Sequence, residues 1–151
     1  MISIFREFKD VKKNINKSIV AIGNFDGLHL GHKAVLNQAK FIKKKNGGKL
    51  IILTFYPHPL KILRPGNEPK NIISFRNKVI KMEAIGIDIL LAQRFNINFS
   101  KFTPYNFVNN VLINGLKASD IIVGADFHFG YKRKGNVEYL MSQEFRKYFN
   151  V

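Results

Sequence analysis

Short apolar runs alternate along this chain with longer segments whose apolar residues recur at helical spacing. Four runs, bounded by glycine or polar residues, are typical of buried strands and cover residues 18–23, 49–55, 87–92 and 119–124. In residues 32–45, apolar positions recur at helical spacing and lysines crowd the end, which is typical of a helix. Because strands alternate with helices, the pattern predicts an α/β fold with a mostly parallel sheet and helices on both faces.

Capping and breaking residues indicate where other helices begin and end. Ser74 is a favourable N-cap and Gly86 a favourable stop, while Thr103 followed by Pro104 opens another helix before Gly115. These signals predict helices over residues 75–84 and 104–114. A weaker pattern predicts a final helix over residues 137–148.

Residues 56–72, YPHPLKILRPGNEPKNI, carry four prolines and predict a loop over the sheet edge. Such loops often carry binding groups. In parallel α/β sheets, ligands bind beyond the carboxyl ends of the strands. This rule brings together the turn over residues 23–32, the turn over 56–59, the region near Gln93 and the loop that starts at Gly124. We expect the binding site at this edge.

The length and composition suit one domain. The chain has 151 residues, 46% of them apolar, and no cysteine, which excludes disulfides, thiolate metal ligands and cysteine nucleophiles. No stretch approaches the roughly 20 apolar residues that span a bilayer, and the first residues do not form a secretory signal. We therefore expect a cytoplasmic protein that does not bind membranes.

The formal net charge is +15, from 25 Lys and Arg against 10 Asp and Glu. Such a surface attracts polyanions, so nucleic acids and nucleotides are both candidate ligands. The basic residues are scattered, and they are not interleaved with aromatic residues in the manner of RNA-binding segments. We interpret most of them as solvated charges and expect small nucleotides as partners.

The stretch GNFDGLHLGH, residues 23–32, joins the first predicted strand to the first predicted helix. A helix N-terminus presents free N–H groups and the positive end of the dipole, so a phosphate fits there. His29 and His32 lie within about 60° of each other around a helix axis and can contact one ligand together. Asp26 is expected to brace the turn by accepting backbone N–H groups, with contact to a metal or substrate as the alternative.

Two imidazoles beside helix N–H groups suit nucleotidyl transfer, in which a phosphate attacks the α-phosphorus of a nucleoside triphosphate and pyrophosphate leaves. This chemistry depends on positioning and charge stabilisation, without a covalent intermediate. The sequence has no HExxH motif, no cysteine pair and no carboxylate cluster of ligand spacing. We therefore expect Mg²⁺ to arrive with ATP, keeping several waters.

Three motifs, in order along the chain, resemble those of one family. GNFDGLHLGH resembles the HxGH signature of the nucleotidyltransferase superfamily. TFYPHP, residues 54–59, is similar to the second-strand turn of bacterial FAD synthetases, and IIVGADFHFGYKRKGN, residues 121–136, is similar to their VGxDFxFGxxxxG loop. The chain thus resembles the N-terminal FMN adenylyltransferase domain of the bacterial FAD synthetase family.

This resemblance implies a Rossmann-like (HUP-type) domain that transfers AMP from ATP to FMN, with Mg²⁺, giving FAD and pyrophosphate. It implies that His29 and His32 are catalytic and bind the ATP phosphates. The nucleotide-binding residues that it implies are Gly23, Asn24, Phe25, Asp26, Gly31, Gly124 and Asp126. The flavin-binding residues that it implies are Pro57, His58, Phe127 and Phe129. A core position for the two phenylalanines and a hydrogen bond from His58 to a neighbouring loop are the alternatives.

The sequence departs from the family pattern at two places. His128 stands where the family loop commonly has arginine. Neither the Ser/Thr-rich segment resembling ISSTxIR nor the all-β riboflavin kinase module follows, so we expect one C-terminally truncated domain over residues 1–151. Its activity would be impaired unless a separate chain supplies that segment. The alternative functions are an HxGH nucleotidyltransferase with another acceptor, and a nonenzymatic basic relic of the fold that binds nucleotides or nucleic acid.

Overall fold

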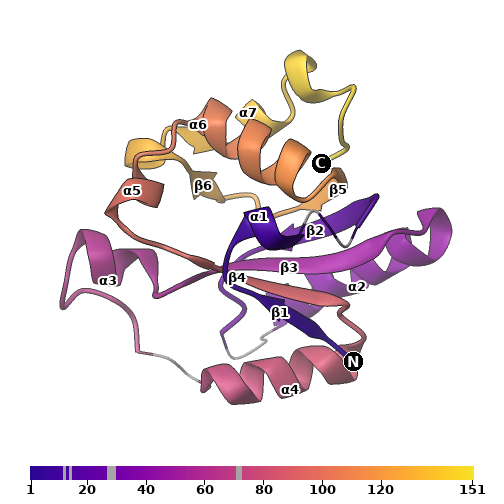
Figure 1. The fold of residues 1–151 in the computed structure, drawn as a ribbon, viewed down its shortest axis with the longest axis horizontal. Coiled ribbons are helices and arrows are strands. Elements are labelled where there is room, and N and C mark those ends of the chain that lie inside the picture. Colours follow the sequence, from indigo (N-terminus) through magenta and orange to yellow (C-terminus); the bar gives the residue numbers. More distant parts are fainter. Residues whose placement is uncertain (12, 14, 27–29, 71–72) are drawn as a thin grey trace.

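A computed structural model of the chain describes residues 1–11, 13, 15–26, 30–70 and 73–151. Its centre is a five-stranded parallel sheet with the strand order β1-β4-β3-β2-β5 (Figure 1). The strands are β1 (Ser3–Phe5), β2 (Ser18–Ile22), β3 (Lys49–Tyr56), β4 (Ile89–Arg94) and β5 (Ala118–Ile122). The predicted α/β class is confirmed, and four of these strands lie within about two residues of the predicted runs.

Helices cover both faces of the sheet, because side chains along each strand alternate between two apolar clusters. One face packs against α1 (Phe8–Val11) and η2 (Phe107–Gly115), and the other against α2 (Leu30–Asn46) and α4 (Phe75–Ile85). In β3, for example, Ile51 joins the first cluster and Ile52 the second. Figure 1 shows η2 and α4 on opposite sides of the sheet.

Shorter elements connect and extend this framework. They are α3 (Pro59–Leu63), α5 (Ile97–Ser100), α6 (Pro104–Asn106), β6 (His128–Phe129), η3 (Tyr131–Arg133), β7 (Gly135–Asn136), α7 (Val137–Leu140) and η4 (Gln143–Phe145). The strands β6 and β7 pair antiparallel as a separate small hairpin.

The predicted caps are present. The hydroxyl of Ser74 accepts a hydrogen bond from the Asn77 N–H at 3.1 Å, and Gly86 ends α4 with a left-handed φ of 99°. Thr103 caps α6 in the same way. Beyond α6 the helix widens into the π-helix η2, where the Leu116 N–H bonds to the Val111 carbonyl at 2.8 Å. No sequence signal distinguishes this π-helix from the predicted α-helix.

The predicted final helix over residues 137–148 is wrong. The α-helical part stops at Leu140, and Ser142 takes extended dihedral angles that begin the short 3₁₀ turn η4. Leu140, Phe145 and Phe149 are all buried. The bend places these three apolar side chains in one core, and serine is a residue that favours such a helix start.

Several short elements were not among the sequence predictions, among them β1, α1 and α3. The edge strand β1 has only three residues and its Ile4 is exposed, so its alternation is too brief to recognise. The helix α1 follows it directly. The helix α3 lies inside the proline-rich segment, where His58 caps it and Pro59 takes its first position. Proline is favoured there, so the His-Pro pair was the available signal.

The connections place the candidate turns along one edge. The chain runs from β2 through α2 to β3 and through α4 to β4, stepping away from β2, and then returns to β5 on the other side of β2. All five strands are parallel, so the segments after β2, β3 and β5 leave from the same edge of the sheet. The strand order changes direction between β2 and β5, which is where α/β sheets bind ligands.

Candidate functional site

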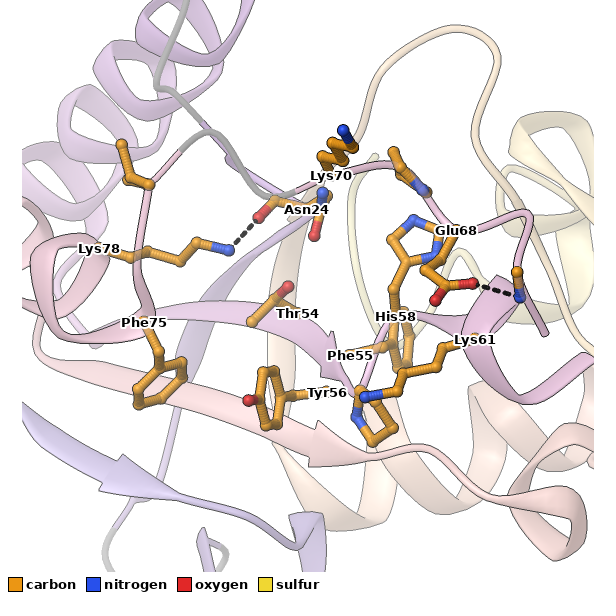
Figure 2. Close-up of a pocket in the computed structure, with 14 residues that line it drawn as sticks. Asn24, Thr54, Phe55, Tyr56, His58, Lys61, Glu68, Lys70, Phe75 and Lys78 are labelled. Atoms are coloured by element: carbon orange, nitrogen blue, oxygen red, sulfur yellow. Dashed lines mark hydrogen bonds between the residues drawn. The ribbon is translucent and has the colours of Figure 1, made fainter.

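A cavity of about 430 Å³ opens at the carboxyl ends of β2 and β3, between these ends, α3 and α4 (Figure 2). Its walls come from four parts of the chain: the turn after β2, the end of β3, the proline-rich segment with α3, and α4 with the residue before its cap. The lining residues are Asn24, Thr54, Phe55, Tyr56, Pro57, His58, Lys61, Gly66, Glu68, Pro69, Lys70, Ile73, Phe75 and Lys78.

The side chain of Phe25 anchors the turn after β2 in the apolar core. This side chain is 1% exposed, and its backbone has a φ of 53°, a left-handed conformation that costs a non-glycine residue on the order of 1 kcal/mol or more. Burial of the ring offsets that cost. A Cβ on Gly23 would lie 3.1 Å from this ring, so a larger residue there would require the ring to move by a few tenths of an ångström. The His32 ring lies 5.0 Å from the Phe25 ring, between centroids.

Asp26 ties this turn to the segment that enters α4. Its Oδ1 accepts a hydrogen bond from the Ile73 N–H at 3.1 Å. Asp26 therefore accepts a backbone N–H group, but from a residue 47 positions away, so bracing of the turn itself stays a prediction. Asp26 thus fixes the distance between the turn after β2 and the wall of the cavity.

Lys78 makes the second tie between α4 and the turn. Its Nζ donates a hydrogen bond to the Asn24 carbonyl at 2.9 Å, drawn as a dashed line in Figure 2. Burial lowers the pKa of Lys78, and the negative charge of Asp26 opposes that shift. The cavity therefore holds a half-buried ammonium group beside the turn.

Thr54 brings a buried hydroxyl to the same wall. The residue is 3% exposed and lies in β3, two positions before the strand ends. Its Oγ1 has no hydrogen-bond partner among the residues that the structure describes. In Figure 2 the hydroxyl points toward the side of the cavity where Asn24 and Lys78 meet.

His58 caps α3 by accepting the Leu60 N–H at its Nδ1, at 3.1 Å. The bond leaves the neutral ring with its proton on Nε2, a donor available to a ligand. Burial lowers the pKa of His58; nearby Glu68 raises it and Lys78 lowers it further. The predicted bond from His58 to a neighbouring loop is wrong, because the partner lies two residues away in the helix that His58 caps.

An aromatic wall forms the lower side of the cavity in Figure 2. The rings of Tyr56 and Phe75 lie 5.5 Å apart between centroids. The Arg6 guanidinium lies 5.2 Å from the centre of the Tyr56 ring, and its Nη2 donates to the Tyr56 carbonyl at 3.2 Å. Planar, apolar surfaces of this kind suit the flat ring system of a ligand.

The loop from Gly124 leaves the sheet one strand away, after β5. A hydrogen bond joins the Phe127 N–H to the Gly124 carbonyl at 3.1 Å, and His128 Nδ1 lies 2.7 Å from the Asp126 carbonyl. The ring of Phe129 is 6% exposed and stacks on Phe127. None of the described residues of this loop lines the cavity. The core position offered as the alternative for Phe129 is therefore observed.

Three other residues from the sequence predictions do not line the cavity or cannot be placed in it. His29 is not among the described residues, so its position relative to His32 stays a prediction. Gly31 lies in the first turn of α2, and only its backbone is described. Gln93, near the predicted edge, is buried and accepts the Phe8 N–H at 2.8 Å, which makes it part of the fold.

Thr54, Tyr56, Phe75 and Lys78 were missing from the predicted site. Thr54 and Tyr56 belong to the TFYPHP motif and were open to prediction from it. The pattern of apolar and polar residues along α4 does not indicate that Phe75 and Lys78 face the turn after β2. That contact depends on how the helix packs against the rest of the fold.

Two features are absent from the residues that the structure describes. Among the described residues, no three histidine, aspartate or glutamate side chains gather into a group that could hold a metal ion. Within the same part of the chain, no helix is both long and apolar enough to cross a membrane.

Comparison with known proteins identifies the family. A sequence model described as FAD synthetase matches residues 11–151. The chain is 38% identical over 148 residues to the bifunctional riboflavin kinase/FMN adenylyltransferase of Buchnera aphidicola subsp. Schizaphis graminum, covering 98% of this chain and 47% of that protein. The protein of the same description from Bacillus subtilis is 36% identical over 129 residues, covering 85% and 40%.

Among solved structures, one described as a macrolide-efflux protein from Streptococcus pneumoniae superposes with a TM-score of 0.80 at 24% identity. The superposition covers all of this chain and 50% of the Streptococcus pneumoniae chain. At 24% identity this similarity supports the fold alone. The chain spans about half the length of the curated relatives it matches. With the family match over residues 11–151 and relatives of up to 38% identity, the chain belongs to the FAD synthetase family.

Proposed function

We propose that this chain transfers AMP from ATP to FMN, giving FAD and pyrophosphate. The observation that carries the proposal is the cavity of about 430 Å³ beside the turn that enters α2, with an aromatic wall and cationic groups. A flat flavin fits the aromatic wall, and a phosphate fits the cationic side. The relatives' description as FMN adenylyltransferases supports the same acceptor.

In this proposal the turn after β2 and the start of α2 bind the ATP phosphates. His29 and His32 donate hydrogen bonds to the phosphate oxygens, where negative charge develops as pyrophosphate leaves. Gly23, Asn24, Phe25, Asp26 and Gly31 shape the nucleotide side. Gly124 and Asp126 flank it from the neighbouring strand end, where the strand order reverses.

The flavin side of the proposed site is formed by the turn after β3. Pro57 and His58 line the cavity, and the Nε2–H of neutral His58 is a donor for an oxygen or nitrogen of the flavin. Contact of Phe127 with the flavin stays a prediction. Phe129 is buried, so it would act by supporting the Phe127 ring on which it stacks.

Mg²⁺ fits this proposal as part of the substrate. The described residues form no three-ligand group of their own, and Mg²⁺ is commonly held by substrate phosphates, water and one or two carboxylates. When bound with ATP, the ion would neutralise charge on the triphosphate. The chain's residues would position the nucleotide and the acceptor.

The test is to incubate the purified chain with ATP, Mg²⁺ and FMN and to measure FAD and pyrophosphate together. The proposal predicts equal amounts of both products, formed only when FMN is present. Pyrophosphate release that does not depend on FMN, with another mononucleotide as the better acceptor, would show a different nucleotidyltransferase. Binding of ATP and FMN without product would show a chain that binds nucleotides without transferring AMP, and would contradict the proposal.

A further inference from the structure

The Thr54 hydroxyl is a buried polar group with no partner in the part of the chain that the structure describes. The residue is 3% exposed, and its Oγ1 has no hydrogen bond to any residue that the structure describes. Buried polar groups in folded proteins are nearly always hydrogen-bonded, so such a group calls for an explanation. Because the hydroxyl lies in the cavity wall, a ligand atom can satisfy it.

Lys78 supplies a cation to the same side of the cavity. Its Nζ donates one hydrogen bond to the Asn24 carbonyl, at 2.9 Å. An ammonium group has three N–H donors, so two others can bind a ligand. The side chain is half-buried, and burial lowers its pKa because the charged form loses hydration. An anion bound here would compensate that loss. Figure 2 shows Lys78 and Thr54 directed toward the same region of the cavity.

The position of Lys78 and Thr54 beside the proposed site of transfer indicates which anion they would bind. In the proposed transfer, an oxygen of the FMN phosphate forms a bond to the α-phosphorus of ATP, and the bond from that phosphorus to pyrophosphate breaks. The acceptor phosphate must therefore lie beside the turn that leads into α2. Lys78 contacts Asn24 in that turn, whereas Tyr56 and Phe75 form the aromatic wall farther along the cavity.

We propose that Lys78 Nζ and Thr54 Oγ1 form a subsite for the phosphate of the acceptor mononucleotide, which selects a phosphorylated flavin over an unphosphorylated one. The inference rests on the proposed AMP transfer to FMN. It adds two residues that bind the acceptor phosphate and orient it for attack. It also makes phosphate recognition separable from recognition of the flavin ring.

The test compares FMN with riboflavin, which has the same ring system without the phosphate. Dissociation constants for both are measured by flavin fluorescence in the wild-type chain, in Lys78→Met and in Lys81→Met. Lys81 is an exposed lysine on the same helix and serves as the matched control. Lys78→Met is expected to weaken FMN binding by about tenfold or more, since charge-assisted hydrogen bonds are the strong ones. Riboflavin binding should change less than about twofold, and Lys81→Met should resemble the wild type.

Thr54→Val tests the hydroxyl at nearly constant volume. It should weaken FMN binding by about threefold to tenfold, the size expected for one hydrogen bond, while Thr54→Ser keeps the hydroxyl and most of the affinity. Without ligand, Thr54→Val should melt no lower than the wild type, because it removes a buried hydroxyl that has no partner among the described residues. A clearly lower melting temperature would mean that the hydroxyl has a partner in the fold, and would overturn its assignment to the subsite.

The outcomes separate this inference from the proposed function. If wild-type FMN binding is intact and Lys78→Met binds FMN as well as Lys81→Met does, the subsite is wrong and AMP transfer stands. The subsite is also wrong if Lys78→Met loses affinity for riboflavin and FMN by the same factor. If the wild type binds riboflavin too weakly to measure, the comparison of the two lysine variants with FMN decides. Absence of FMN binding in the wild type would contradict the proposed function itself.

Discussion

Single side chains in this protein serve the fold and the candidate site together, and His58 is an example. It begins α3 by accepting the Leu60 N–H, and it lines the cavity with its other nitrogen. The capping role needs the neutral ring, because a proton on Nδ1 would remove the acceptor, whereas Nε2–H is a donor in both the neutral and the charged ring. The motif placed His58 at the site, but its capping role depends on the conformation of the residues that follow.

Protonation of His58 should therefore weaken the fold at acidic pH. Its pKa in the folded chain lies below the ordinary value of 6.5, chiefly because of burial, so the unfolded chain binds the proton more tightly. This contribution to stability is complete above that value and is lost as the pH falls below it. His58→Asn keeps an N-cap acceptor that does not titrate, and its melting temperature should fall less than that of the wild type between about pH 7.5 and pH 5.5.

The control is His128→Asn, which makes the same substitution at an exposed histidine. Its change in melting temperature between the two pH values is the reference for the change measured in His58→Asn. If His58→Asn and His128→Asn both follow the wild-type curve, the ring of His58 does not carry the predicted effect.

At the scale of elements, local signals predicted most of the sheet and its helices. The strands β2 to β5 are mostly apolar because both faces of the sheet are covered. Ser74, Gly86 and Thr103 mark helix ends through contacts within one turn. The prediction failed where the deciding contact is distant. β1 is defined by pairing with β4, and the bend at Ser142 by the burial of Phe145 and Phe149.

The helix α4 offers a measurable case, because its residues Phe75 and Lys78 line the cavity. Ser74→Ala removes the acceptor for the Asn77 N–H and should lower the free energy of unfolding by about 1 kcal/mol. Ser74→Asp keeps an acceptor and places a negative charge at the helix N-terminus, so its stability should match or exceed the wild type. Denaturant unfolding measures both. Equal stability of the alanine and aspartate variants would show that this cap contributes little.

At the scale of the whole molecule, the site joins segments that are far apart in the sequence. The sequence motifs located the turns after β2, β3 and β5 because each contains its own glycines, prolines or histidines. The contacts of Lys78 with Asn24 and of Asp26 with Ile73 join residues 54 and 47 positions apart. No spacing rule connects such residues, so the cavity they enclose became apparent only in the folded chain.

The net charge of +15 also acts at this scale. It should favour binding of anionic nucleotides and make that binding sensitive to salt. Raising NaCl from about 50 mM to about 300 mM should weaken ATP binding by about threefold or more, because the screening length shortens. Adenosine carries no phosphate and is the control, with an affinity that should remain nearly constant. Equal salt dependence for ATP and adenosine would mean that the surface charge does not assist phosphate binding.

The central claim is transfer of AMP to FMN at the turn that carries His29 and His32. The most direct measurement is the initial rate of FAD formation from ATP and FMN, for the wild-type chain and for the His29→Ala, His32→Ala double variant. Loss of even one such donor commonly lowers a rate by about 100-fold to 1,000-fold, so FAD formation by the variant should fall at least that far. FAD formation at equal rates by both proteins would contradict the account.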